Sequence, residues 1–338
     1  MIAGRYIIQC ATLVIALAIA WFRPAGVQEN VETLRVSVLM VTVDTQVLNA
    51  KTGRAISPLE SRDFQVYEDG VQQKIISFSQ DELPLSVVFL FDLTDSVRPV
   101  LKSLASGSLQ ALHRLRPDDE VAVMVYSASA TVLQDFTTDR QLAADAILKA
   151  SKMESGEAAF FNESIFQAAV QSAKSKIPSS RRVVLWMTDN VPNIPSEEIR
   201  QRYGRSLSAS QLHTKNQATA ELLKSGAVVY TLLRTSEISD QMALHDSSRI
   251  VSGMLYPPGD VWQYSQLTGG HVIESSAKKM ESILVNWIDE IRTRYTLGYR
   301  PPPGKSQDKF CKIEVKLSPD VRKREGKLLV EARRGYYR

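Results

Sequence analysis

The sequence contains few of the residues that build disulfide-stapled domains or metal clusters. It has two cysteines and four histidines among 338 residues. Cys10 falls within an apolar N-terminal stretch, so the rest of the chain holds only Cys311 and an internal disulfide is excluded there. The histidines lack the spacing of a metal cluster and stand at positions 113, 213, 245 and 271.

The sequence also lacks a block of charge of one sign. The formal net charge is +4, and the basic residues that crowd the last forty positions are interleaved with acidic ones. This mixture is typical of a solvated strand face, so we expect no nucleic-acid partner. An apolar content of 44% is enough for one large core and a smaller one, without disorder or repeats.

Residues 1–25 have the pattern of an export signal. Arg5 precedes the apolar run 7–22, and the small residues Ala20 and Ala25 offer cleavage positions. We expect an exported protein, located in the periplasm, in the cell envelope or outside the cell. Contact with a membrane is expected only through this segment, if it stays uncleaved as an anchor.

The remaining chain divides into three stretches. Residues 33–80 alternate as strands do, and Asp69-Gly70 between apolar runs predicts a hairpin. Residues 84–294 alternate strands with helices, and residues 295–338 return to strand texture. We expect the two β stretches to form a small module beside the α/β domain, because each is short for a core of its own.

The central stretch predicts a doubly wound, mostly parallel sheet. The expected strands span residues 86–91, 121–126, 183–187, 228–233 and 271–273. The expected helices span residues 103–115, 140–150, 163–176, 218–225 and 278–294. Ligand sites in such sheets lie at the carboxyl ends of the strands, where Asp92 and Asp189 stand.

The loop after the first of these strands has the residue types of a cation site. Asp92, Thr94 and Ser96 would place one carboxylate and two hydroxyls on the same side of a strand-to-helix turn. Oxygen ligands of this kind suit a hard divalent cation such as Mg²⁺. Asp95 adds a further carboxylate nearby, which would either assist a cation or repel an acidic ligand.

Several motifs in the same order resemble the von Willebrand factor A (VWFA) domain, and in particular bacterial VWFA-related exported proteins. The matching segments are residues 59–64, 67–70, 92–96, 267–270, 295–299 and 334–337. The resemblance implies a doubly wound fold and a metal-ion-dependent adhesion site. In the family that site combines an Asp-x-Ser-x-Ser loop with a distant Thr and a distant Asp.

Carried over to this chain, the adhesion site consists of Asp92, Thr94, Ser96 and Asp189. The distant Thr is missing, since Ala159 or Ala158 stands at its position. The resemblance implies Mg²⁺, or else Mn²⁺ or Ca²⁺, and a protein partner that offers an acidic residue. Two long polar stretches, 190–216 and 235–260, follow strands at the same edge, where partner specificity usually resides.

Other readings stay open or are weaker. A metal-independent scaffold with a decayed site explains the missing Thr equally well. The strand ending in Asp92 also resembles the start of a haloacid-dehalogenase-type phosphatase, but Thr94 stands where that class needs a second Asp. No Ser/His/Asp order or glycine-rich phosphate loop is present, so we expect no enzymatic activity. We assign Cys311, Trp186 and Phe161 to packing.

Overall fold

The computed structural model describes residues 40–80, 83–127, 129–154, 159–190, 213–234, 261–303 and 309–337. The predicted export segment lies outside these ranges, and so do most of the polar stretches 190–216 and 235–260. Within the described ranges, every helix is too short or too polar to cross a membrane.

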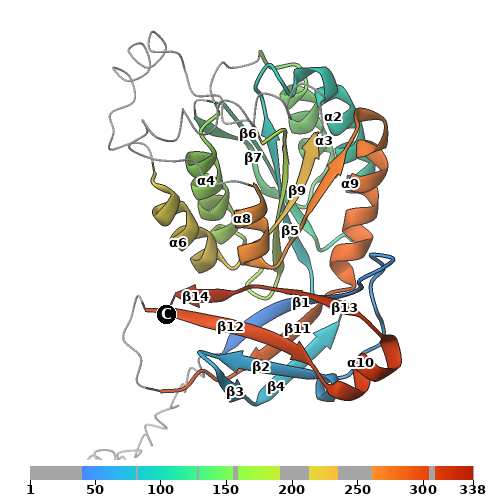
Figure 1. The fold of residues 1–338 in the computed structure, drawn as a ribbon. Coiled ribbons are helices and arrows are strands. Elements are labelled where there is room, and N and C mark those ends of the chain that lie inside the picture. The colour runs from blue at the N-terminus through green and yellow to red at the C-terminus, as the bar shows by residue number, and fades with distance from the viewer. Residues whose placement is uncertain are drawn as a thin grey trace, which may run out of the picture. The chain divides into compact units, whose positions relative to one another are not determined.

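A six-stranded sheet forms the centre of the α/β domain, in the order β10-β9-β8-β5-β6-β7 (Figure 1). Its strands are β5 (Leu85–Asp92), β6 (Glu120–Tyr126), β7 (Ala130–Thr137), β8 (Arg181–Thr188), β9 (Val228–Arg234) and β10 (Val272–Ser275). All neighbours are parallel except β7, which pairs with β6 in the antiparallel sense. Numbered along the chain, this is the doubly wound order 3-2-1-4-5-6, which reverses direction between β5 and β8.

Helices cover both faces of this sheet. They are α2 (Arg98–Leu112), α3 (Arg140–Ala150), α4 (Phe161–Ala173), α6 (Lys215–Ser225), α8 (Val261–Thr268) and α9 (Ala277–Arg292). One core cluster joins α2, α3 and α9 to side chains such as Phe89 and Phe91, and a second joins α4, α6 and α8 to Leu90 and Trp186. Burial on both faces explains why the strands are continuous apolar runs.

The β module consists of two antiparallel sheets, β13-β1-β11-β4 and β14-β12-β2-β3. Its strands from the N-terminal side are β1 (Val41–Asn49), β2 (Phe64–Glu68), β3 (Val71–Gln73) and β4 (Ile75–Gln80), with a 3₁₀ turn η1 (Ser61–Asp63). From the C-terminal side come β11 (Tyr295–Tyr299), β12 (Phe310–Leu317), β13 (Leu328–Ala332) and β14 (Gly335–Tyr337), with helix α10 (Pro319–Glu325). β1 lies between β11 and β13, and β2 pairs with β12, which confirms that the two β stretches build one module.

Buried arginines join the module to the α/β domain. Arg181, at the start of β8, donates to the Oδ1 atom of Asp44 on β1 at 3.3 Å and to the carbonyl oxygen of Ile291 at 2.7 Å. Arg294 donates to the Tyr230 hydroxyl at 2.9 Å and to the Asp44 carbonyl at 3.2 Å. Both arginines are buried, so these hydrogen bonds are shielded from water. They hold β1 against the amino ends of the parallel strands.

Several predicted elements differ from those observed. The hairpin at Asp69-Gly70 is present, with left-handed φ angles of 48° and 83°. The run that follows it is divided between β3 and β4, which belong to different sheets. Helix α2 begins five residues earlier than predicted, with Pro99 in its first turn. The prediction omitted β7, α8 and α10. β7 is a half-exposed edge strand, and the two helices are short, so their hydrophobic patterns are weak.

Candidate functional site

The predicted loop lies at the point where the strand order reverses. Asp92 is the last residue of β5, and its neighbours across the sheet are Tyr126 at the end of β6 and Thr188 at the end of β8. Asp189 follows Thr188 directly. Ligands of doubly wound sheets bind outside this reversal, so the fold brings the predicted residues of β5 and β8 to the expected edge.

The carboxylate of Asp92 is fully buried and accepts four hydrogen bonds from the chain itself. Its Oδ1 atom accepts from the Thr94 backbone N–H at 2.9 Å and from the Thr94 hydroxyl at 2.7 Å. Its Oδ2 atom accepts from the Tyr126 hydroxyl at 2.8 Å and from the Thr188 hydroxyl at 2.7 Å. A carboxylate offers about four lone-pair positions, so the protein itself occupies all of those on Asp92.

The surroundings of Asp92 disfavour its ionised form. Burial raises the pKa of the Asp92 carboxyl to about 6, and the neighbouring charge of Asp189 adds to the shift, while the hydrogen bonds from Thr94 and Thr188 oppose it. Two carboxylates that repel each other in a buried setting would be stabilised by a nearby positive charge. The electrostatics of this edge therefore favour a cation.

The two hydroxyls of the loop lie at a spacing that suits a small cation. Thr94 Oγ1 and Ser96 Oγ are 3.1 Å apart. Adjacent ligands of an octahedral Mg²⁺ ion with bonds near 2.1 Å are separated by about 3.0 Å, so both oxygens could bind one ion with little movement. The Thr94 hydrogen is donated to Asp92, so Ser96 is the donor in its contact with Thr94 Oγ1, which keeps one further lone pair available.

The position that the resemblance gives to the distant Thr has no ligand side chain. Ala159, at the position that the resemblance gives to the distant Thr, is 3% exposed and belongs to the core cluster under α4. It offers no oxygen side chain, and Ala158 lies outside the described residues. Asp95 is exposed at the surface of the loop. The described site thus combines two carboxylates with two hydroxyls.

Sequence reasoning did not identify the residues that hold Asp92. Trp186, predicted to be core, is fully buried, and its indole N–H also donates to the Tyr126 hydroxyl at 2.9 Å. Tyr126 ends the predicted strand 121–126 and Thr188 directly follows the predicted strand 183–187, and the sequence assigns neither of them to the site. The available signal was a polar residue at the carboxyl end of each of two strands that flank β5, because side chains in register on parallel strands share one face.

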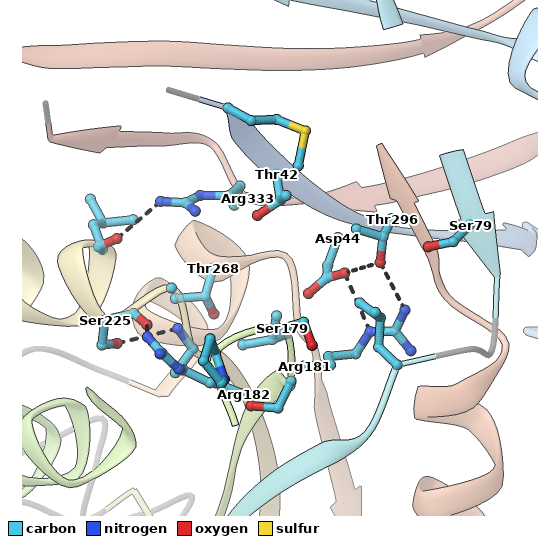
Figure 2. Close-up of a pocket in the computed structure, with 18 of the residues that line it drawn as sticks. Thr42, Asp44, Ser79, Ser179, Arg181, Arg182, Ser225, Thr268, Thr296 and Arg333 are labelled. Carbon is cyan, nitrogen blue, oxygen red and sulfur yellow. Dashed lines mark hydrogen bonds and ion pairs between the residues drawn. The ribbon is translucent and has the colours of Figure 1, made fainter. Parts of the chain in front are cut away.

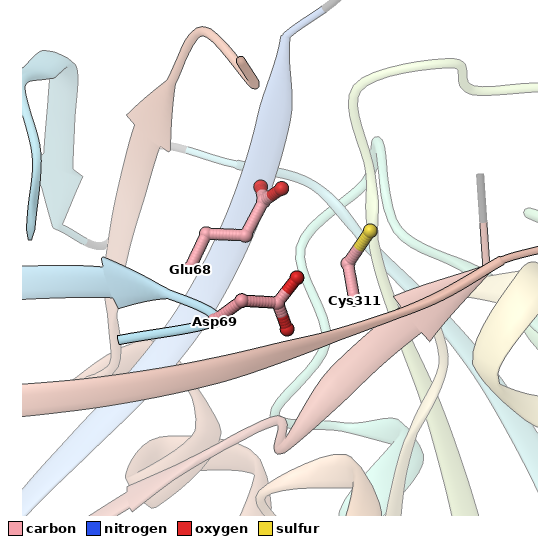
Figure 3. Close-up of side chains that lie close together, drawn as sticks. All are labelled: Glu68, Asp69 and Cys311. Atoms are coloured by element: carbon pink, nitrogen blue, oxygen red, sulfur yellow. The ribbon is translucent and has the colours of Figure 1, made fainter. Parts of the chain in front are cut away.

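A second group of possible metal ligands lies in the β module, away from the Asp92 edge (Figure 3). Glu68, Asp69 and Cys311 each have a ligand atom within 4.8 Å of the others. Glu68 is buried and accepts hydrogen bonds from the Tyr299 and Tyr336 hydroxyls at 2.8 and 3.2 Å. Cys311 is fully buried, as its predicted packing role requires, but its carboxylate neighbours were not foreseen.

The remaining singled-out side chains have structural contacts. Phe161 is buried and packs edge-on against Trp186 at a centroid distance of 5.2 Å. His213 Nδ1 lies 2.6 Å from Glu163 Oε2, and His271 Nδ1 lies 3.1 Å from Glu331 Oε2. These two histidines occupy different parts of the molecule, and His245 lies outside the described residues.

A scan against protein-family models and a search of curated protein sequences found no match. Among solved structures, the chain is similar to the vWF domain of the type V pili tip protein Mfa5 from Porphyromonas gingivalis, with 12% identity, a TM-score of 0.41, and coverage of 62% of this chain and 95% of that one. It is also similar to a von Willebrand factor type A protein from Catenulispora acidiphila, with 10% identity, a TM-score of 0.42, and coverage of 77% and 72%.

A third similar structure is proximal thread matrix protein 1 from the mussel byssus, solved with a zinc-occupied MIDAS motif, with 11% identity and a TM-score of 0.40. The match covers 62% of this chain and 48% of that protein, so the chain spans about half of its length. At such identities the similarity concerns the fold. Residues 85–292 form a doubly wound α/β domain, and it is in fold that the chain is similar to these von Willebrand factor A structures.

Proposed function

We propose that this protein is an exported, non-enzymatic binding module that recognises a protein partner at the edge formed by Asp92, Thr94, Ser96 and Asp189. A divalent cation, Mg²⁺ or else Mn²⁺ or Ca²⁺, is held there weakly. The observation that carries the proposal is the convergence of two hydroxyls, 3.1 Å apart, with two mutually repelling carboxylates at the reversal point of the sheet.

Each residue has a distinct role in this proposal. Thr94 and Ser96 supply neutral oxygens, so a bound ion keeps positive charge for an acidic group of the partner. Ser96 has to turn its hydrogen away from Thr94 to do so. Asp92 contributes mainly its charge and its hold on the Thr94 hydroxyl, because its own lone pairs are engaged. Asp189 adds the second negative charge.

The absence of a ligand side chain at Ala159 makes the binding weak rather than impossible. Mg²⁺ keeps several waters readily, and water can take the place of one missing hydroxyl. The same absence, together with the four internal hydrogen bonds of Asp92, favours a second candidate function. In that case the edge is a metal-independent scaffold surface whose loop is held by its own hydrogen bonds.

A capture experiment with matched variants separates the two functions. The immobilised protein is incubated with native cell-envelope extract in Mg²⁺ or in chelator, beside Ser96→Ala and the exposed control Ser282→Ala. The cation proposal predicts a captured protein that is lost with chelator and with Ser96→Ala, but retained by Ser282→Ala. Capture that is indifferent to chelator and to Ser96→Ala supports the scaffold function.

Export is tested separately by sequencing the N-terminus of the native protein. The signal pattern of residues 2–25 predicts a mature chain that begins after Ala20 or Ala25. Recovery of Met1 on a cytoplasmic species would contradict export.

A further inference from the structure

A cavity of about 460 Å³ opens at the amino ends of the parallel strands, between the α/β domain and the β module (Figure 2). It lies at the opposite end of β8 from Thr188 and Asp189, since Arg181 and Arg182 at the start of that strand line it. The end of α6 and strands β1 and β4 supply other walls. Its volume is in the range of small-molecule sites.

Two arginines that line this cavity donate hydrogen bonds to the last turn of helix α6. Arg182 Nη1 donates to the carbonyl oxygen of Ser225 at 2.8 Å, and Arg333 Nη2 donates to that of Leu223 at 2.9 Å. Both arginines line the cavity (Figure 2). The bonds satisfy final carbonyls of α6, whose partial negative charge they partly balance.

Those bonds leave most of the donors of both groups unused. A guanidinium has five N–H groups. Arg182 uses one of them, and its Nε atom is buried without a hydrogen-bond partner. Arg333 uses a second on the carbonyl oxygen of Gly335 at 3.1 Å. Guanidinium donors that line a cavity are suited to oxyanions, which accept several hydrogen bonds at once.

The charges around the cavity are also unbalanced. Asp44 is the carboxylate that lines it, and its Oδ1 atom accepts from Arg181 at 3.3 Å and from Thr296 at 2.8 Å. Within the described part of the chain, neither Arg182 nor Arg333 forms an ion pair with a carboxylate. Burial lowers the pKa of Arg333, although the charge of Asp44 opposes the shift. Both arginines are half-buried, and Arg333 also lies over the Tyr336 ring at 5.8 Å from its centroid. A bound anion would add a counter-charge beside these two groups.

We propose that this cavity binds a small organic anion, whose carboxylate or phosphate group is held by Arg182 and Arg333. The apolar part of the ligand packs against Leu222 and Val228, which line the same space. The hydroxyls of Thr42 and Ser179 face the cavity as further polar contacts (Figure 2). The site is independent of the cation and partner proposed for the Asp92 edge.

Calorimetric titration of the full chain with benzoate, phenyl phosphate and benzyl alcohol tests the proposal. We expect saturable binding of at least one of the two anions at millimolar concentration or below, and none of the neutral alcohol. Whichever anion binds more tightly identifies the carboxylate or the phosphate as the preferred group. Absence of saturable binding for both anions would overturn the proposal, and so would equal binding of benzyl alcohol.

Variants locate the binding. Arg333→Gln should weaken it at least about tenfold, since a charge-assisted hydrogen bond to the anion is lost. The exposed control Arg322→Gln should not change it. Ser179→Trp fills the cavity from an exposed wall position without removing charge, so it should abolish binding even if Arg333→Gln fails to fold. Unchanged affinity in a folded Ser179→Trp protein would place the anion elsewhere and refute the site.

Discussion

Tyr126→Phe removes one hydroxyl from the hydrogen-bond network around Asp92 and so tests what that network contributes to stability. It donates to Asp92 Oδ2 at 2.8 Å and accepts from the Trp186 indole at 2.9 Å, and all three side chains are fully buried. Tyr126→Phe keeps the ring in place between Phe161 and Trp186, so packing changes little. What changes is the polar network below the Asp92 edge.

The Tyr126 hydroxyl also lies 3.1 Å from the Thr188 hydroxyl, but the expected cost follows from the loss of its bonds to Asp92 and Trp186. A hydrogen bond to a charged group contributes about 1.5–3 kcal/mol, and a buried donor left without an acceptor costs about 1–3 kcal/mol. Tyr126→Phe should therefore lower the free energy of unfolding by about 3–5 kcal/mol. At about 2–4 °C per kcal/mol for a domain of this size, the melting temperature should fall by about 6 °C or more.

Tyr295→Phe is the matched control. The Tyr295 hydroxyl is also buried and also makes two bonds, donating to the Ile56 carbonyl at 2.9 Å and accepting from the Leu59 N–H at 3.0 Å, but neither partner is charged. Urea unfolding of both variants, followed by circular dichroism, should show the larger loss for Tyr126→Phe. An equal or smaller loss would refute the claim that Tyr126 stabilises an ionised Asp92.

Two further predictions concern the junction between the α/β domain and the β module. Asp44→Asn should lower the free energy of unfolding by about 3–5 kcal/mol, because it leaves the buried Arg181 and Arg294 without their anion. Burial raises the pKa of Asp44, but the charges of the two arginines lower it overall, so in urea unfolding this difference from wild type should shrink as pH falls through the folded pKa. His271→Gln should behave in the opposite way: burial lowers the pKa of His271, but the hydrogen bond and charge of Glu331 raise it overall. The stability that His271 adds should be complete below its unfolded pKa near 6.5 and should be lost as pH rises through the folded value, as melting curves from pH 5.5 to 8.5 would show; a pH-independent difference from wild type would contradict this.

Much of the fold was accessible from the sequence because burial on both faces leaves a strong pattern. The apolar run at 85–91 and the amphipathic pattern of α9 are of this kind, and α3 was predicted with its observed bounds. β7 escaped because it lies at the sheet edge with half-exposed side chains. The break between β3 and β4 depends on which sheet each strand joins, and that is a tertiary property.

The site was accessible only in part. Asp92, Thr94 and Ser96 are close in sequence, so their spacing revealed them, and Asp189 followed from the end of β8. Tyr126 lies 34 residues from its partner Asp92, and Thr188 lies 62 residues from its partner Tyr126. Their role depends on the register of three parallel strands, which no local pattern encodes. Arg182 and Arg333 line one cavity although Arg182 belongs to the α/β domain and Arg333 follows β13 of the β module. That arrangement is likewise tertiary.

Calorimetric titration with Mg²⁺ tests the proposed cation site most directly. Wild type should bind weakly through Thr94 and Ser96, and Ala159→Thr should bind more tightly because it restores a hydroxyl. The control Ala173→Thr, at an exposed position at the end of α4, should match wild type. Ser96→Ala should lose the heat of binding, and melting temperatures should rise with Mg²⁺ in the order of affinity. If neither wild type nor Ala159→Thr releases or absorbs heat across millimolar Mg²⁺, and both melt at unchanged temperatures, the edge is not a cation site.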